Sequence, residues 1–490
     1  MGDFIFDKDI FKEKFLQGKD LRNRAKSTAK NCDSVCPVGS DTSTQYSKIT
    51  ELDIVTDLLH SLQKERINTK KLPDINNKLM SEIEKQVKIP DDRLKPVFRS
   101  IMEDLYLGDS GDSELSSLSL LRYRDIGTQA DIGKFIYDVL LDDETRLKLQ
   151  KMLNEAENPL DDIVNRAYSE LNILQKEDGG QEYTRIFGQE LKGIFETLNR
   201  DIQVALNVQE GFTEELTFLI SYFSFIYLSQ LALRLDRDLY HKESDERMHL
   251  LFKMGKESVS NDRECIALGW RRLEKKTKKI FSHLVLLNML NEHDNTSPFL
   301  TYSELYKLYE DNPNMRAKME DAIDFLIEEY TVKHTYGARN GGIINFTELA
   351  REFGTAGTIE YFIAKIQYLF DCIEYQLQGI PTRETVRRNV WCNYEHLLKI
   401  RFVKSWGNQG KMIMISNNDL LLMIRICQRS SENMISNLGI QINDLFNEFE
   451  KRGLCFDGQS KQYIIKYLHE INLIDSKSDS EEAQYVKQIQ

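Results

Sequence analysis

The sequence lacks the short motifs that usually mark an active site. It contains no phosphate-binding loop of the form G-x-x-x-x-G-K-[ST], no G-x-S-x-G nucleophile elbow and no H-E-x-x-H helix. The stretch Gly407–Met412 has similar letters at a different spacing, between two segments that are expected to be strands. We therefore predict that the chain is not an enzyme and binds no cofactor.

Paired metal ligands are also scarce. Of the seven cysteines only Cys32 and Cys36 are close in sequence, whereas a structural zinc site usually takes four ligands from two close pairs. His241 and His249 are separated by about 12 Å of helical rise, too far to share one ion without a bend. We predict no metal site, and unpaired thiols of this kind suit a reducing cytoplasm.

The chain has fewer Lys and Arg (65) than Asp and Glu (78), which gives a net charge of −13 at pH 7. Such a chain is a poor independent ligand for nucleic acid, because phosphate contacts need clustered Lys and Arg. Two local basic segments stand out: Trp270–Lys279, with six Lys/Arg against one Glu, and a second segment near Trp391 and Trp406. Both are candidates for contact with DNA or with an acidic partner, and the sequence leaves these two alternatives open. The candidate contact residues are Arg271, Arg272, Lys275, Lys276, Lys279, Arg383, Arg387 and Arg388, with Lys399, Arg401 and Lys404 near the second group. In the first segment we expect Arg272, Lys275, Lys276 and Lys279 to form one helical stripe.

One long uncharged run, Leu216–Leu233, raises the question of a membrane span. Its eighteen residues are just long enough, but seven of them carry hydroxyl or amide groups. No basic flank sets an orientation, and charges run through the first fifteen residues where a signal peptide would be apolar. We predict a central helix buried on most sides, and no membrane association.

The spacing of apolar residues predicts a mainly α, multidomain chain. The expected divisions are an N-terminal arm (1–50), a helical domain (51–210), a central helical core (211–295), a mixed α/β segment (296–435) and a C-terminal domain (436–490). The basic segment is expected to begin one helix running from Gly269 to Leu290. A short β-hairpin is predicted near 398–416, where two segments rich in β-branched and aromatic residues flank G-N-Q-G.

The last fifty residues predict a winged-helix-like α+β domain. An amphipathic helix over Ile442–Gly453 is followed by a second over Ser460–Ile474, with Ser460 as the expected N-cap, and then by a hairpin. Residues 441–490 hold nine Asp/Glu against six Lys/Arg, which favours contact with protein over contact with DNA.

Three segments resemble a known family. Phe218–Leu235, Ser258–Glu274 and above all the ending Leu445–Ile489, "LFNEFEKRGLCFDGQSKQYIIKYLHEINLIDSKSDSEEAQYVKQI", are similar to the DptG family of DNA phosphorothioation-dependent restriction proteins. The resemblance extends over the whole chain, and none of these segments is a catalytic motif. It implies one subunit of a bacterial defence complex that attacks DNA lacking backbone sulfur, with the ATP-binding motifs on partner subunits.

The function we predict is a non-catalytic subunit of such a restriction complex, which bridges partner subunits and meets DNA directly or through those partners. One alternative is a metal-dependent nuclease whose carboxylates follow no recognisable motif. Another is a regulatory winged-helix protein.

Overall fold

The computed structural model describes most of the chain. The described residues are 4–15, 35–38, 48–68, 75–87, 89, 91–106, 118–124, 126, 131–154, 159–176, 182–208, 211–241, 248–255, 263–291, 299–333, 343–378, 391–407, 410–435, 438–474 and 484–489.

The fold is mainly helical, as predicted. The helices of the described residues are α1 (Lys8–Phe15), α3 (Glu51–Gln63), α4 (Ile75–Gln86), η3 (Asp92–Leu94), α5 (Lys95–Tyr106), α6 (Leu118–Leu121), α7 (Ile132–Phe135), the π-helical turn η4 (Ile136–Leu140), α8 (Asp143–Leu153), α9 (Pro159–Leu171), α10 (Lys192–Leu206), α11 (Phe212–Leu239), α12 (Glu264–Ala267), α13 (Trp270–Thr277), α14 (Ile280–Leu290), α15 (Tyr302–Asp311), α16 (Pro313–Lys333), η5 (Phe346–Leu349), α17 (Ile359–Gln378), α18 (Cys392–Lys399), α19 (Asn417–Ser430), α20 (Ile442–Lys451) and α21 (Gly458–Glu470).

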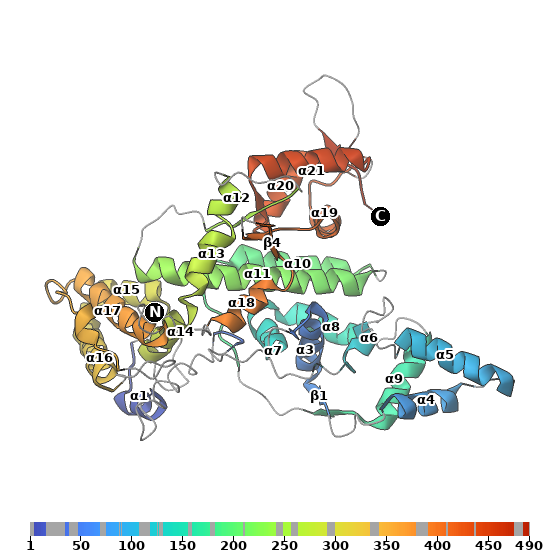
Figure 1. Ribbon diagram of the computed structural model, residues 1–490, viewed down its shortest axis with the longest axis horizontal. Helices are drawn as coiled ribbons and strands as arrows, with labels where there is room; N and C mark the ends of the chain where they lie inside the picture. Colours follow the sequence, from blue (N-terminus) through green and yellow to red (C-terminus); the bar gives the residue numbers. More distant parts are fainter. Residues whose placement is uncertain are drawn as a thin grey trace.

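Helix α11 lies at the centre of the molecule. It runs beside α10 through the middle of Figure 1 and also contacts α3, α13, α14, α15, α17, α18 and α19. It is long and apolar enough to cross a membrane, yet its most apolar 18-residue window is entirely buried within the chain. The prediction of a central helix buried on most sides is therefore confirmed.

Helix α3 packs against both α11 and α7. Thr50 and Asp53 form a reciprocal capping box that begins α3. Helix α7 crosses α3 so closely that a Cβ on Gly133 would lie 2.1 Å from the backbone of Asp57, whose carboxylate accepts the Gly133 N–H at 2.5 Å. Helices α4, α5 and α9 project away from the centre at one end of the molecule and share a small apolar cluster of their own (Figure 1).

Within the described residues the strands form four two-stranded pairs. Antiparallel pairs join β1 (Glu65–Ile67) to β2 (Leu174–Lys176), β4 (Val403–Ser405) to β5 (Lys411–Ile413), and β6 (Ile440–Gln441) to β8 (Tyr485–Val486), whereas β3 (Leu251–Phe252) runs parallel to β7 (Cys455–Phe456). The β4–β5 pair is the hairpin predicted near 398–416, and the prediction is confirmed.

The two helices predicted near the C-terminus are present as α20 and α21, but the expected cap of α21 is wrong. The helix begins two residues before Ser460, and Asp457 is the N-cap, accepting the Ser460 N–H at 2.8 Å. Ser460 is instead buried inside the first turn and contacts Arg263. After α21, Ile474 forms a bridge with Val486; the acidic segment 475–483 lies outside the described residues.

Buried ion pairs fasten the C-terminal helices to the central ones. Arg452, which is fully buried, donates to both carboxylate oxygens of Asp201 on α10 and to Glu448, all at 2.8 Å. Glu215 on α11 pairs with Arg425 and Arg429 on α19. One hydrophobic cluster extends from Phe4 to Val486 across these elements, and the expected division into five domains stays a prediction.

Candidate functional site

The basic segment begins with a short helix, not with the long helix that we expected. Helix α13 ends at Thr277, and α14 begins at Ile280, so the predicted single helix over Gly269–Leu290 is wrong. The Thr277 hydroxyl donates to the Leu273 carbonyl at 2.6 Å, and the Lys279 N–H bonds the Lys276 carbonyl in a tight three-residue turn. Side-chain hydroxyls that bond the backbone four residues back often bend helices.

The inner face of α13 is anchored. Trp270, Leu273 and Thr277 are buried in the protein. Lys276 makes an ion pair with the buried Asp236 of α11, and the Lys279 amine lies 3.7 Å from Glu374 of α17. Burial lowers the pKa of Lys279, but the carboxylates around it outweigh burial and raise it overall. Lys276 thus ties α13 to α11, and Lys279, the residue just before α14, ties the junction of the two helices to α17.

The outer face of α13 carries the exposed charge. Arg271, Lys275 and Lys278 are exposed, at positions i, i+4 and i+7 of one face. Arg272 is half-buried, with a guanidinium nitrogen 3.9 Å from the Met248 sulfur. The solvent-facing set therefore differs from the expected stripe, of which only Lys275 is exposed.

The second basic segment is described only in part. Arg383, Arg387 and Arg388 lie outside the described residues. Arg401 is engaged by Glu51 and Asp419, whereas Lys404 on β4 is exposed. Burial lowers the pKa of Arg401, but its two carboxylate partners raise it overall.

The fold brings the two basic segments together. Helix α13 packs against both α18 and β5, which lie on either side of Lys404 in the sequence. The Lys399 amine lies 5.6 Å from the ring centroid of Trp270, so one side chain from each segment meets at this boundary. We define the basic surface by the cations of α13, α18 and the β4–β5 hairpin: the exposed Arg271, Lys275, Lys278, Lys404 and Lys411, and the partly buried Lys399.

A carboxylate sits between two of these lysines. Glu395 makes an ion pair with Lys399 one helical turn away and accepts from Lys411 at 3.3 Å. Burial raises the pKa of Glu395, but the two lysines lower it overall. Sequence reading missed Glu395 and Lys411. The Glu395–Lys399 spacing was visible as an i, i+4 pair, but the approach of Lys411 depends on the packing of the hairpin.

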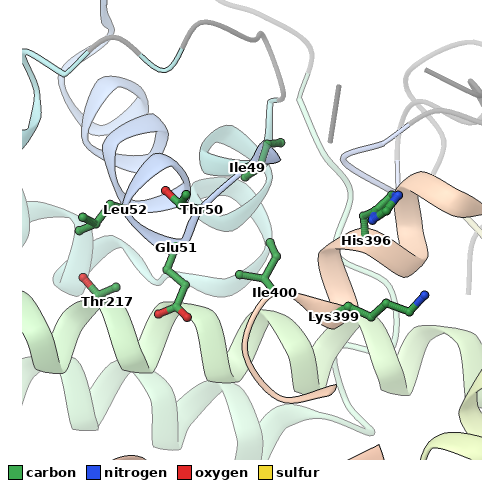
Figure 2. A pocket seen from close by; sticks show the side chains of 8 residues that line it. All are labelled: Ile49, Thr50, Glu51, Leu52, Thr217, His396, Lys399 and Ile400. Atoms are coloured by element: carbon green, nitrogen blue, oxygen red, sulfur yellow. The ribbon is translucent and has the colours of Figure 1, made fainter. Parts of the chain in front are cut away.

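An open pocket adjoins the basic surface (Figure 2). Its volume is about 520 Å³, and it lies between the start of α3, helix α11 and helix α18. In the figure His396 and Lys399 extend from α18 with their nitrogen atoms on the side away from Glu51. Burial raises the pKa of Glu51, although Arg401 opposes the shift. The lining residues are Ile49, Thr50, Glu51, Leu52, Thr217, His396, Lys399 and Ile400.

The residues that could have formed a metal site do not assemble one in the described part of the chain. There, no group of three or more His, Cys, Asp or Glu side chains is arranged to hold an ion. His241 and His249 are exposed, and 242–247 between them lie outside the description. Cys36 is buried, whereas Cys32 lies outside the described residues.

The buried aromatic rings limit what the basic surface can contact. Trp270 and Trp391 are buried, and Trp406 is half-buried with the Lys253 amine 3.9 Å from its ring centroid. Stacking of unpaired bases needs an accessible aromatic face. Of these three indoles, two have none, and the third is covered on one side by an amine.

Comparison with known proteins does not test the resemblance to the DptG family, which stays a prediction. No protein-family model matches the chain, and no curated protein matches its sequence.

Proposed function

We propose that this chain is a non-catalytic binding subunit of a DNA phosphorothioation-dependent restriction complex, working in the cytoplasm with ATP-binding partner subunits. The sequence resemblance supplies this assignment. The structural observation that supports it is the packing of α13 against α18 and the hairpin. This packing brings together cations from distant segments of an acidic chain.

We propose that the basic surface meets the phosphate backbone of duplex DNA. The cations lie on α13, α18 and the hairpin, of which α13 packs against the other two, and the nearby indoles are buried or covered. A surface with cations and few free aromatic faces suits backbone contact better than base stacking. Docking of an acidic protein segment is the other outcome of the test.

We further propose that α19 through β8 form a winged-helix-like unit that contacts partner subunits. The order α19, β6, α20, β7, α21, β8 supports this: β6 pairs with β8 and Ile474 bridges to Val486, whereas β7 pairs with β3 from earlier in the chain. The unit would then begin at Asn417, earlier than the boundary at 436 that we expected. On the outer face of α21, Lys466 lies 3.9 Å from Glu470, so this face has little net charge to offer DNA.

Co-purification tests the assignment. A tagged full-length chain, expressed from its native locus, is expected to bring down partner subunits that carry nucleotide-binding motifs. The charge variant Arg271→Ala/Lys275→Ala/Lys278→Ala should still assemble if these residues contact DNA. Loss of assembly in this variant, with assembly kept in the matched variant Lys151→Ala/Lys307→Ala/Lys318→Ala, would assign the surface to a protein partner. All three control lysines are exposed.

A nuclease assay separates the proposal from its enzymatic rival. Purified chain with Mg²⁺ or Mn²⁺ is expected to leave unmodified duplex DNA intact. Cleavage by the chain alone, abolished by chelation, would contradict the non-catalytic assignment.

A further inference from the structure

Glu395 places a negative charge inside the basic surface. It lies on α18, makes an ion pair with Lys399 one helical turn further along, and accepts from Lys411 of β5 at 3.3 Å. The Glu395 side chain is 13% exposed, whereas those of Lys399 and Lys411 are 22% and 40% exposed. The carboxylate is thus more enclosed than either of the two amines that it binds.

The other cations of the basic surface are not held in this way. Lys278 lies 3.7 Å from Glu274 on the solvent-facing side of α13, and exposed pairs of this kind contribute little. Lys399 and Lys411 share a carboxylate that is shielded from water, where attraction between charges is stronger. Three cations of the surface make no ion pair within the described residues: Arg271, Lys275 and Lys404.

A DNA phosphate would have to compete with the Glu395 carboxylate for the same amines. Both groups are anionic oxygen acceptors that bind a lysine ammonium through charged hydrogen bonds. Burial raises the pKa of Glu395, but the two lysines lower it overall, so the carboxylate is ionised at neutral pH. Because two amines share one carboxylate, it cancels one of their two positive charges and also repels an approaching phosphate.

We propose that Glu395 is an internal counter-ion that weakens the contact between the basic surface and duplex DNA. This inference rests on the proposed function, because it names the residue that limits the affinity of that same surface. With Glu395 in place, DNA contact depends mainly on the cations of α13 and on Lys404. A counter-ion of this kind suits an acidic chain that meets DNA within an assembly and does not bind it firmly alone.

The test compares duplex binding by the assembled complex with the wild-type chain and with Glu395→Gln. Fluorescence anisotropy measures the affinity between 50 and 200 mM salt (a range of about fourfold). The variant should bind more tightly at the lowest salt, and its log–log slope should be steeper by about 0.9, because one more cation is available to a phosphate. Its advantage over the wild type should therefore fall by about 3.5-fold across this range.

Two further variants separate this effect from a change in net charge. Glu395→Gln/Lys411→Gln has the same local charge as the wild type and should return to the wild-type slope. Glu144→Gln is the matched control, since Glu144 is also paired with a lysine one helical turn further along, Lys148 on α8. It adds the same net charge outside the basic surface and should change neither affinity nor slope.

Equal slopes for Glu395→Gln and the wild type would overturn the inference, as would an equal gain in Glu144→Gln. If the charge variant Arg271→Ala/Lys275→Ala/Lys278→Ala still flattens the slope in either case, the proposed DNA contact stands without this counter-ion. If neither the charge variant nor Glu395→Gln changes the slope, both proposals fail. Circular dichroism checks folding, and Glu395→Ala, which leaves room for water between the two amines, replaces Glu395→Gln if that variant does not fold.

Discussion

Arg452 has the largest side chain that the described structure buries completely. Its guanidinium holds Asp201 and Glu448 on two different helices and also donates to the Ser430 hydroxyl at 2.7 Å. Burial raises the pKa of Asp201, with Arg452 opposing the shift. A buried charge of this kind is tolerated only because its donors are satisfied, so removing one partner leaves the others unpaired.

Arg452→Met should therefore destabilise the protein strongly. We expect a loss of about 3 to 5 kcal/mol in the free energy of unfolding at pH 8, measured by urea denaturation. The loss should be smaller at pH 5, because an unpaired, buried Asp201 can accept a proton there. Arg93→Met, at a side chain that is 90% exposed, is the control and should change stability little. Equal stability of the two variants would show that the network is not important for folding.

His283 gives a second prediction, in the dependence of stability on pH. It is fully buried against Phe370, and burial lowers its pKa to about 3. The unfolded state binds a proton near pH 6.5 and the folded state does not, so this histidine costs stability as the pH falls below about 6.5, until about pH 3. From pH 7 to pH 5 the loss is about 2 kcal/mol.

The measurement compares urea denaturation of the wild type and His283→Leu at pH 7 and pH 5. The variant should lack this part of the acid sensitivity, whatever its absolute stability. His249→Leu, at an exposed histidine, should keep the wild-type difference. An unchanged pH difference in His283→Leu would contradict the account of its burial.

Helix α11 is an element that the local sequence pattern predicts correctly. Its uncharged run predicted a buried helix correctly, because so many apolar side chains are unfavourable in water. The hairpin was predictable for a similar reason, since Gly407 and Gly410 both have positive φ in the turn. Both conclusions rest on neighbouring residues alone.

The break between α13 and α14 could not be predicted from the sequence pattern. Lys and Ile are acceptable in a continuous helix, so the pattern over Gly269–Leu290 gave no reason to stop. At the break the Thr277 hydroxyl bonds the Leu273 carbonyl and Ile280 is buried against other elements, neither of which can be read from the local sequence. Asp457, and not Ser460, caps α21. Ser460 lies inside the packed first turn, where its hydroxyl accepts from the Met254 N–H at 3.1 Å.

Substitutions at Ser224 test the packing of α11. Its side chain is 8% exposed, and the described residues give its buried hydroxyl no hydrogen-bond partner. Ser224→Arg should lower the free energy of unfolding by several kcal/mol, since a buried unpaired charge is costly. Ser224→Ala should be neutral or slightly stabilising, because it removes an unpaired polar group. Thermal unfolding of both variants checks this, and a tolerated arginine would contradict a fully enclosed helix.

The assembled molecule explains why only part of the candidate surface could be foreseen. Sequence reading found the basic residues of 270–279 because they are contiguous. It could not decide which of them face solvent, because Asp236 and Glu374 reach Lys276 and Lys279 from distant helices. It also could not place Lys411 beside Lys399, since that contact follows from the docking of a hairpin against two helices.

The salt dependence of DNA binding tests the proposed surface most directly. Binding of a duplex to the assembled complex is measured by fluorescence anisotropy between 50 and 200 mM salt (a range of about fourfold), for the wild type, the charge variant Arg271→Ala/Lys275→Ala/Lys278→Ala and the matched control variant. The proposal predicts that the charge variant binds more weakly and that its log–log slope is flatter by about 2.7, or about 0.9 for each lost phosphate contact. The control variant should match the wild type. Equal affinity and slope for the charge variant and the wild type would contradict contact between this surface and DNA.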